Sequence, residues 1–234
     1  MNQSSGLQSG MYAVSLWISR FALANLQWIL FSLPIWWIVL RMLDLEQAEQ
    51  WLYVLPPLLV GLPVFFFPAT AALFAKARSW IIPKEEEKER SYLSYYKENY
   101  KKSFRGGVVL TLFWAVLAGD LYYFSMKSHL LMNLFFILAL LLAVFTINFF
   151  SVLVHFDMNV KPLLKKAFLT TFSSPVLFGA VAISFLVILS ISLYVFPLMI
   201  PIFSGIIIAF LAFSAFYRLY LKLNTENKPN SAAS

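Results

Sequence analysis

Six long apolar stretches constrain this chain more than any other feature of its sequence. A helix rises about 1.5 Å per residue, so roughly 20 apolar residues are needed to cross a hydrocarbon layer about 30 Å thick. Because 61% of the 234 residues are hydrophobic and only 12% are charged, a soluble domain of this length could not bury its apolar side chains. We expect an all-α integral membrane protein with transmembrane helices at about 21–40, 51–75, 108–126, 130–154, 175–196 and 201–217.

The last two stretches are separated only by the short segment VFPLMIP. The 43 residues from Pro175 to Tyr217 are too many for one crossing, which favours two spans, and a re-entrant hairpin stays open as an alternative. All six spans belong to one polytopic membrane domain, residues 1–223. The small polar residues that follow predict a disordered tail at 224–234.

The positions of lysine and arginine predict the orientation. If six spans alternate, 16 of the 18 cations fall on one side of the membrane, and only Arg41 and Lys127 fall on the other. Cytoplasmic loops collect these residues, so we expect both termini in the cytoplasm, N-in and C-in. The net charge of +7 then reflects topology and attraction to anionic lipids of the bilayer, and no nucleic-acid partner is expected.

Two cytoplasmic segments have the pattern of amphipathic helices that lie at the membrane interface. In residues 84–105, glutamates begin the segment, cations end it, and Gly106 and Gly107 supply a stop. An aromatic stripe recurs every four residues there. We expect the stripe and its lysines to meet lipid or a partner protein: Tyr92, Tyr96, Tyr100, Phe104, Lys97, Lys101 and Lys102. A shorter interfacial helix is expected at 160–173.

A few polar side chains inside the predicted spans are the candidates for a functional site. Asp120 is either a proton or cation site or an anchor at the outer interface. A polar stripe toward the cytoplasm lines a vestibule or bonds neighbouring helices together, and it consists of Asn148, Ser151 and His155, with Asp157 just beyond. Asn25 in the first span is a candidate for a bond to another helix.

Motifs that carry enzymatic chemistry are missing from the sequence. It has no cysteine, no phosphate-cradling GxxxxGK[ST] or GxGxxG loop, no GxSxG elbow and no HExxH zinc motif. The two histidines, His129 and His155, lie at opposite ends of one predicted helix and cannot share a metal ion. We therefore expect no cofactor, no metal site and no enzyme activity.

The stretch FPATAALFAKARSW, residues 67–80, predicts a close helix contact. Pro68 can begin a helical segment, and the alanines after it allow a neighbouring helix to approach closely, above all at Ala71 and Ala72. Cations then mark the exit into the cytoplasm, with a tryptophan at the interface. The residues of this motif are Pro68, Ala69, Thr70, Ala71, Ala72, Arg78 and Trp80.

This motif, followed by YYKENYKKSFRGG, resembles the YesL family of bacterial membrane proteins, also called DUF624. The segments NLQWILFSLP, GDLYY and HFDMNVKPLLKKAF resemble further parts of the family pattern, whereas RMLDLEQAEQWLYVLPPLLVGLP is an extra piece. The resemblance implies a place in the bacterial plasma membrane. Genes of the family often neighbour those of carbohydrate ABC transporters, which implies an association with sugar uptake.

Two hypotheses for function follow. The first is a non-enzymatic accessory subunit that binds a membrane partner, which the resemblance implies to be a carbohydrate ABC importer or an associated sensor, with the tyrosine-rich segment as its docking surface. The alternative is a small solute or ion transporter or channel with Asp120 and the Asn148 stripe along its path.

Overall fold

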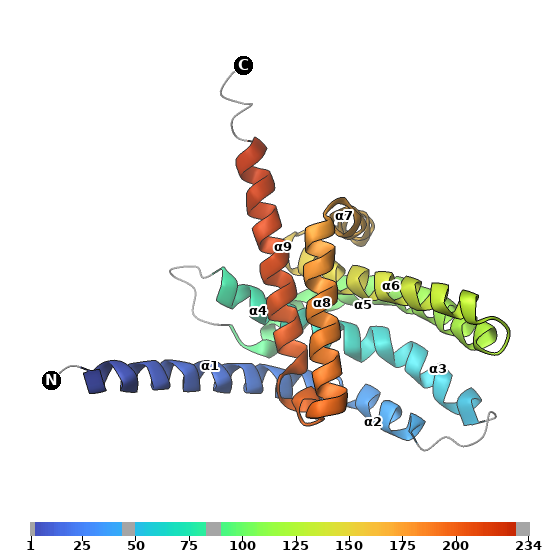
Figure 1. Ribbon diagram of the computed structural model, residues 1–234, viewed down its shortest axis with the longest axis horizontal. Coiled ribbons are helices and arrows are strands. Elements are labelled where there is room, and N and C mark those ends of the chain that lie inside the picture. Colours follow the sequence, from blue (N-terminus) through green and yellow to red (C-terminus); the bar gives the residue numbers. More distant parts are fainter. Residues whose placement is uncertain (1–2, 44–49, 83–89, 228–234) are drawn as a thin grey trace.

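The computed structural model describes residues 3–43, 50–82 and 90–227, and every regular element in these ranges is a helix (Figure 1). Six helical stretches are long and apolar enough to cross a membrane, which confirms the expected all-α class with six spans. They are Gly10–Phe31, Tyr53–Ile81, Tyr92–Ser125, His129–His155, Pro175–Val195 and Ile200–Thr225. The orientation of these spans stays a prediction.

The first span differs from the expected 21–40. Helix α1, Gln3–Phe31, ends before α2, Leu33–Met42, and the apolar part long enough to cross is Gly10–Phe31. The break falls at Ser32, whose hydroxyl donates to the Trp28 carbonyl oxygen at 2.6 Å. Pro34 follows in the first turn of α2 and has no N–H to continue the α1 ladder. The first span therefore ends earlier than expected because of a proline, which a pattern of apolar residues does not reveal.

The second span is longer than the expected 51–75. Helix α3, Trp51–Gly61, passes through a π-helical turn, η2, Leu62–Phe66, directly into α4, Phe67–Ile81. Pro63 sits in the π-helical turn and Pro68 in the first turn of α4, where a missing N–H is tolerated. Arg78 and Trp80 thus lie in the same continuous helix as the alanines before them.

The expected interfacial helix at 84–105 and the third span form one helix, α5, Tyr92–Ser125, and residues 83–89 lie outside the described ranges. The predicted stop at Gly106 and Gly107 is wrong. These glycines are buried because another helix approaches them: a Cβ atom on Gly106 would collide with the ring of Phe149, and one on Gly107 would lie 2.7 Å from Phe67. The missing side chains serve packing and do not end the helix.

The rest of the chain follows the expected spans more closely. Helix α6, His129–His155, runs back antiparallel along α5, and α7, Val160–Ser173, has the bounds expected for the second interfacial helix (Figure 1). Its place at the membrane interface stays a prediction. Four elements form the fifth and sixth spans. Helix α8, Pro175–Ser190, continues into the π-helical turn η3, Ile191–Val195. The π-helical turn η4, Ile200–Ser204, continues into α9, Gly205–Asn227.

The last helix extends into the segment expected to be a disordered tail. Helix α9 continues to Asn227, so the first four residues of the expected tail at 224–234 are helical, and residues 228–234 lie outside the described ranges. The four residues extend a helix that is already formed, and extending a helix requires less free energy than nucleating a new one.

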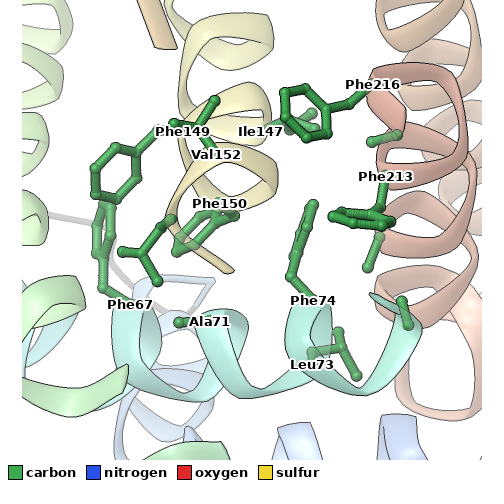
Figure 2. Close-up of a cluster of buried hydrophobic side chains, with 14 of the residues drawn as sticks. Phe67, Ala71, Leu73, Phe74, Ile147, Phe149, Phe150, Val152, Phe213 and Phe216 are labelled. Atoms are coloured by element: carbon green, nitrogen blue, oxygen red, sulfur yellow. The ribbon is translucent and has the colours of Figure 1, made fainter. Parts of the chain in front are cut away.

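Helix α4 is the centre of the packed structure. It contacts α1, α5, α6 and α9, and Ala69, Ala71, Ala72 and Ala77 on it have no exposed surface. Figure 2 shows phenylalanines of α4, α6 and α9 in the space between these three helices. The ring centroid of Phe150 lies 5.4 Å from that of Phe74 and 5.5 Å from that of Phe67. Small side chains on α4 therefore admit large ones from its neighbours.

We predict that Gly106→Ala destabilises the protein while Gly119→Ala does not. Both glycines lie in α5, but a Cβ atom meets Phe149 at Gly106 and nothing within 4 Å at Gly119. Overpacking a dense core costs about 1–3 kcal/mol. Thermal unfolding of both variants in the same detergent measures the difference, and equal midpoints would show that α5 and α6 do not approach this closely.

Candidate functional site

Asn25 of α1 forms hydrogen bonds with the backbone at the irregular start of the sixth span. Its side-chain amide donates to the carbonyl oxygens of Ile200 and Pro201 at 2.9 and 2.8 Å, and its Oδ1 accepts from the N–H of Ile206 at 2.9 Å. These three backbone groups surround the π-helical turn η4, where the helical ladder is interrupted, and Asn25 is fully buried. Gly205 lets it approach, since a Cβ atom there would lie 2.9 Å from its Oδ1.

Two tryptophans continue this polar line along α1 and α2. The indole N–H of Trp28 donates to the Thr70 hydroxyl of α4 at 3.0 Å, and that hydroxyl donates to the Phe66 carbonyl oxygen at 2.8 Å. The indole N–H of Trp36 donates to the Ser32 hydroxyl at 3.1 Å. The polar groups of this region are thus matched to one another inside the packed helices.

The predicted stripe on α6 divides between two neighbours. The amide of Asn148 donates to the Thr171 hydroxyl of α7 at 3.0 Å. His155 instead packs among aromatic rings of α9, with Tyr220 at 4.4 Å between centroids and Phe216 at 5.4 Å. Ser151 is buried, and its hydroxyl oxygen has no hydrogen-bond partner among the described residues, as is also true of the Asn148 Oδ1.

Asp120 stands apart from this stripe. It is half-buried near the far end of α5 and makes no hydrogen bond or ion pair with a side chain in the described ranges. Because α5 and α6 run antiparallel, helical rise places Asp120 roughly 20 Å along the bundle from Asn148. The structure does not bring these two candidates together.

The predicted tyrosine-rich surface is only partly exposed. Tyr92 is 2% exposed, and its hydroxyl donates to the Ala69 carbonyl oxygen of α4 at 2.6 Å, so it is a packing residue. Tyr96 packs on Phe31 with a centroid separation of 4.9 Å. Four residues, spaced i, i+3, i+4 and i+7 on one face of α5, remain exposed or half-exposed. We call them the α5 face: Lys97, Tyr100, Lys101 and Phe104.

A cavity of about 730 Å³ lies where the middle of α1 meets the end of α4, the start of α5 and the end of α6. Its lining is rich in cations and aromatic rings, with two acids. The cations are Arg20, Arg78, Arg90 and Lys102, the acids are Glu98 and Asp157, and the rings are Trp17, Trp80, Tyr95, His155 and Phe156. Of these, Arg78, Trp80, Lys102, His155 and Asp157 are residues that the sequence predicted, from three separate sets.

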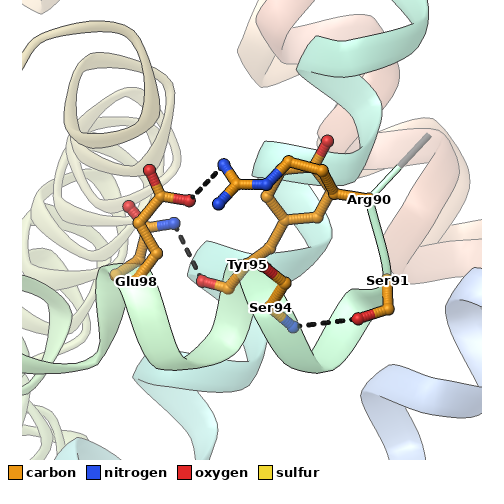
Figure 3. Close-up of polar contacts among 6 residues, drawn as sticks. Arg90, Ser91, Ser94, Tyr95 and Glu98 are labelled. Carbon is orange, nitrogen blue, oxygen red and sulfur yellow. Dashed lines mark hydrogen bonds and ion pairs between the residues drawn. The ribbon is translucent and has the colours of Figure 1, made fainter. Parts of the chain in front are cut away.

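Two of the four cations are paired at the rim. Figure 3 shows Arg90 and Glu98 pointing toward one another, with 2.9 Å between guanidinium and carboxylate, and Arg90 also lies over the Tyr95 ring. Lys102 pairs with the exposed Asp157, and this hydrogen bond holds the pKa of the Asp157 carboxyl below its usual range. The pairs join α5 to the residues just before it and to the segment after α6.

The other two cations have no such partner. Arg20 lies over Trp17, and neither it nor Arg78 forms an ion pair with a carboxylate of the described residues. The Nε of Arg78 is buried without a hydrogen-bond acceptor, and the Nδ1 of His155 is buried without a partner in the same part of the structure. An unmatched buried donor costs about 1–3 kcal/mol, so the Arg78 Nε marks where an acceptor would bind.

The sequence pattern does not single out five residues of this lining: Trp17, Arg20, Arg90, Tyr95 and Glu98. A signal was available: cations with neighbouring aromatic residues flank several predicted spans on the same side of the membrane. That these segments converge on one cavity depends on the helix crossings. No three His, Asp or Glu side chains within residues 3–43, 50–82 and 90–227 gather as ligands for a metal ion.

We predict that Asn25→Leu destabilises the protein and that Gln27→Leu does not. Asn25→Leu removes three buried hydrogen bonds to the backbone of the sixth span, at a cost of about 1–3 kcal/mol. Gln27 is exposed on the same helix and serves as the matched control. Thermal unfolding in lipid nanodiscs checks both, and an Asn25→Leu protein as stable as the control would contradict this role.

Comparison with known proteins finds one family and two relatives to which the sequence is similar. Residues 21–121 match the family described as "Protein of unknown function, DUF624". The chain is 25% identical to "Uncharacterized protein YesL" of Bacillus subtilis (strain 168) over 238 aligned positions, which cover 96% of both chains. It is 28% identical to "Uncharacterized protein YteU" of the same organism over 217 positions, covering 88% of this chain and 83% of the relative. No solved structure matches it. The family match and both relatives agree that this chain is similar to the DUF624 family.

Proposed function

We propose that this protein is a non-enzymatic, multi-pass accessory subunit of the bacterial plasma membrane that binds another membrane protein. By resemblance, the partner is a carbohydrate ABC importer. One observation carries the proposal: the polar side chains within the spans are largely bonded to the chain's own helices. Asn25 binds backbone of the sixth span, Trp28 binds Thr70, and Asn148 binds Thr171. These bonds favour a fixed scaffold over a pathway for solute.

A transporter would need polar groups that continue across the membrane. Asp120 and Asn148 lie roughly 20 Å apart along the bundle, and the residues between them on α6 are apolar except for Thr146, whose hydroxyl donates to the Leu142 carbonyl oxygen at 2.7 Å. The unmatched oxygens of Thr111, Asn148 and Ser151 are what the transporter alternative has in its favour. A flux measurement therefore forms part of the test.

The α5 face is the surface that we assign to the partner. Lys97 and Lys101 are exposed, and the rings of Tyr100 and Phe104 are stacked at 6.3 Å with an interplanar angle of 5°. A rigid aromatic pair flanked by two cations suits a contact with an acidic or aromatic segment at the membrane surface.

A photo-crosslinking experiment tests this assignment. A benzophenone amino acid replaces Lys101 on the α5 face or, as the control, Ile183 on α8, which is 64% exposed. After irradiation of native membranes, we expect the Lys101 probe to yield an adduct with a membrane subunit of a carbohydrate importer. The Ile183 probe should not yield this adduct, and adducts of equal intensity at both positions would contradict the docking surface.

The transporter alternative is tested with the purified chain in liposomes. We expect no flux of sugars or small ions above that of empty liposomes. Flux that disappears in Asp120→Asn or Asn148→Leu would overturn the accessory role and establish the alternative.

A further inference from the structure

We propose that the cavity between the middle of α1, the end of α4, the start of α5 and the end of α6 is a binding site for a phosphate group that carries an organic substituent. The shared chemistry is a phosphate oxyanion, supplied either by an anionic lipid headgroup or by a soluble phosphorylated small molecule. This inference concerns a ligand site within the chain, and it stands independently of the accessory role proposed above.

The charge of the cavity is the first reason. Four cations and two acids line it, and the two acids are already engaged by Arg90 and Lys102. Arg20 and Arg78 are left without a carboxylate partner among the described residues. Two guanidinium groups that face one cavity attract an anion, and the planar donors of arginine match the oxygens of a phosphate better than an ammonium group does.

Unmatched buried atoms are the second reason. The Nε of Arg78 and the Nδ1 of His155 are both buried without a hydrogen-bond partner, and both residues line the cavity. Buried donors in folded proteins are normally matched. A phosphate offers several acceptor oxygens around one centre, so a single group could accept from the Arg78 guanidinium of α4 and the Arg20 guanidinium of α1.

The size and walls of the cavity are the third reason. Its volume, about 730 Å³, lies within the range of small-molecule sites and is far larger than an inorganic phosphate requires. Trp17, Trp80 and Tyr95 supply the apolar walls. The rings of Trp17 and Trp80 meet edge to face at 5.9 Å, and Trp80 stacks on Phe21 at 5.3 Å, which holds this wall in place. The remaining space accommodates a glycerol, sugar or similar substituent.

The described part of the rim is exposed to solvent. Arg90 and Glu98 have side chains that are 46% and 53% exposed, and the Asp157 side chain is 95% exposed. The buried donors therefore lie below an entrance whose own charges are paired. A ligand can reach Arg78 without first separating a buried ion pair.

The test uses the full chain in nanodiscs of phosphatidylcholine, which has no net charge. Its thermal unfolding midpoint is measured with inorganic phosphate and with chloride at the same ionic strength. We expect phosphate to raise the midpoint more than chloride does, because a ligand of the native state stabilises it. Arg78→Gln and Arg20→Gln should each raise the phosphate concentration that is needed for a given midpoint shift about tenfold, because the loss of a charged hydrogen bond lowers the affinity by about that factor.

Arg218→Gln is the matched control. Arg218 is an exposed cation of α9 that does not line the cavity, so its loss should leave the phosphate response unchanged. Arg20 is exposed in the structure, so Arg20→Gln keeps the test valid even where Arg78→Gln unfolds.

A second arm identifies the source of the phosphate. Nanodiscs with added phosphatidylglycerol are compared, and retained lipid is counted by native mass spectrometry. Phosphatidylglycerol that is retained by the wild type, lost in Arg20→Gln and able to suppress the inorganic phosphate response indicates a lipid headgroup. A phosphate response that persists with phosphatidylglycerol indicates a soluble ligand. The proposal is overturned if wild type responds to neither probe, or if both arginine variants respond as Arg218→Gln does. No partner protein is present, so either result leaves the accessory role to its own test.

Discussion

The close approach of helices to α4 is the constraint on which the rest of this structure depends. Lipid chains are as apolar as leucine, so helices inside a membrane gain little from hiding apolar surface and associate instead through contact and internal hydrogen bonds. The alanines of α4 bring α1, α5, α6 and α9 against one rod, and Gly106 and Gly107 extend the same principle to α5. Large rings such as Phe149 and Phe150 then fill the space that the small residues leave.

The same packing explains where the polar groups lie. Because α4 continues without a break to Ile81, it carries Arg78 and Trp80 to the end of the bundle, where α1, α5 and α6 also present cations and rings. Inside the bundle, Asn25 and Thr70 satisfy groups that the irregular turns and the tryptophan would otherwise leave unmatched. The molecule thus combines a bonded interior with a cationic cavity at one end, and the two proposals rest on these two features.

Much of the fold follows from the sequence because a span is a local property. Six apolar runs of sufficient length predict six crossings, and the PATAAL stretch predicts the close contact at α4. The boundaries of the helices are harder to predict from the sequence. Gly106 and Gly107 suggested a stop, since glycine is common after helices, but here the same absence of a side chain admits Phe149 and Phe67. The local pattern cannot distinguish these two uses of glycine.

The candidate site was less predictable for a related reason. Tyr92 fits an exposed aromatic stripe in the sequence, yet it is buried because α4 passes beside it and offers the Ala69 carbonyl oxygen. Arg20, Arg78 and Arg90 come from three segments, and only the crossing of their helices makes them one site. Pattern and charge predict which residues lie near the membrane surface. Their convergence depends on tertiary packing that no local pattern encodes.

The most direct measurement of the central claim compares Ala72→Leu with Ala180→Leu. Ala72 is fully buried on α4, whereas Ala180 is exposed on α8, so the two substitutions add the same atoms to opposite environments. Thermal unfolding midpoints in the same lipid nanodiscs should fall for Ala72→Leu, by an overpacking cost of about 1–3 kcal/mol, and stay unchanged for Ala180→Leu. An Ala72→Leu protein as stable as the wild type would contradict the account that close packing on α4 organises this fold.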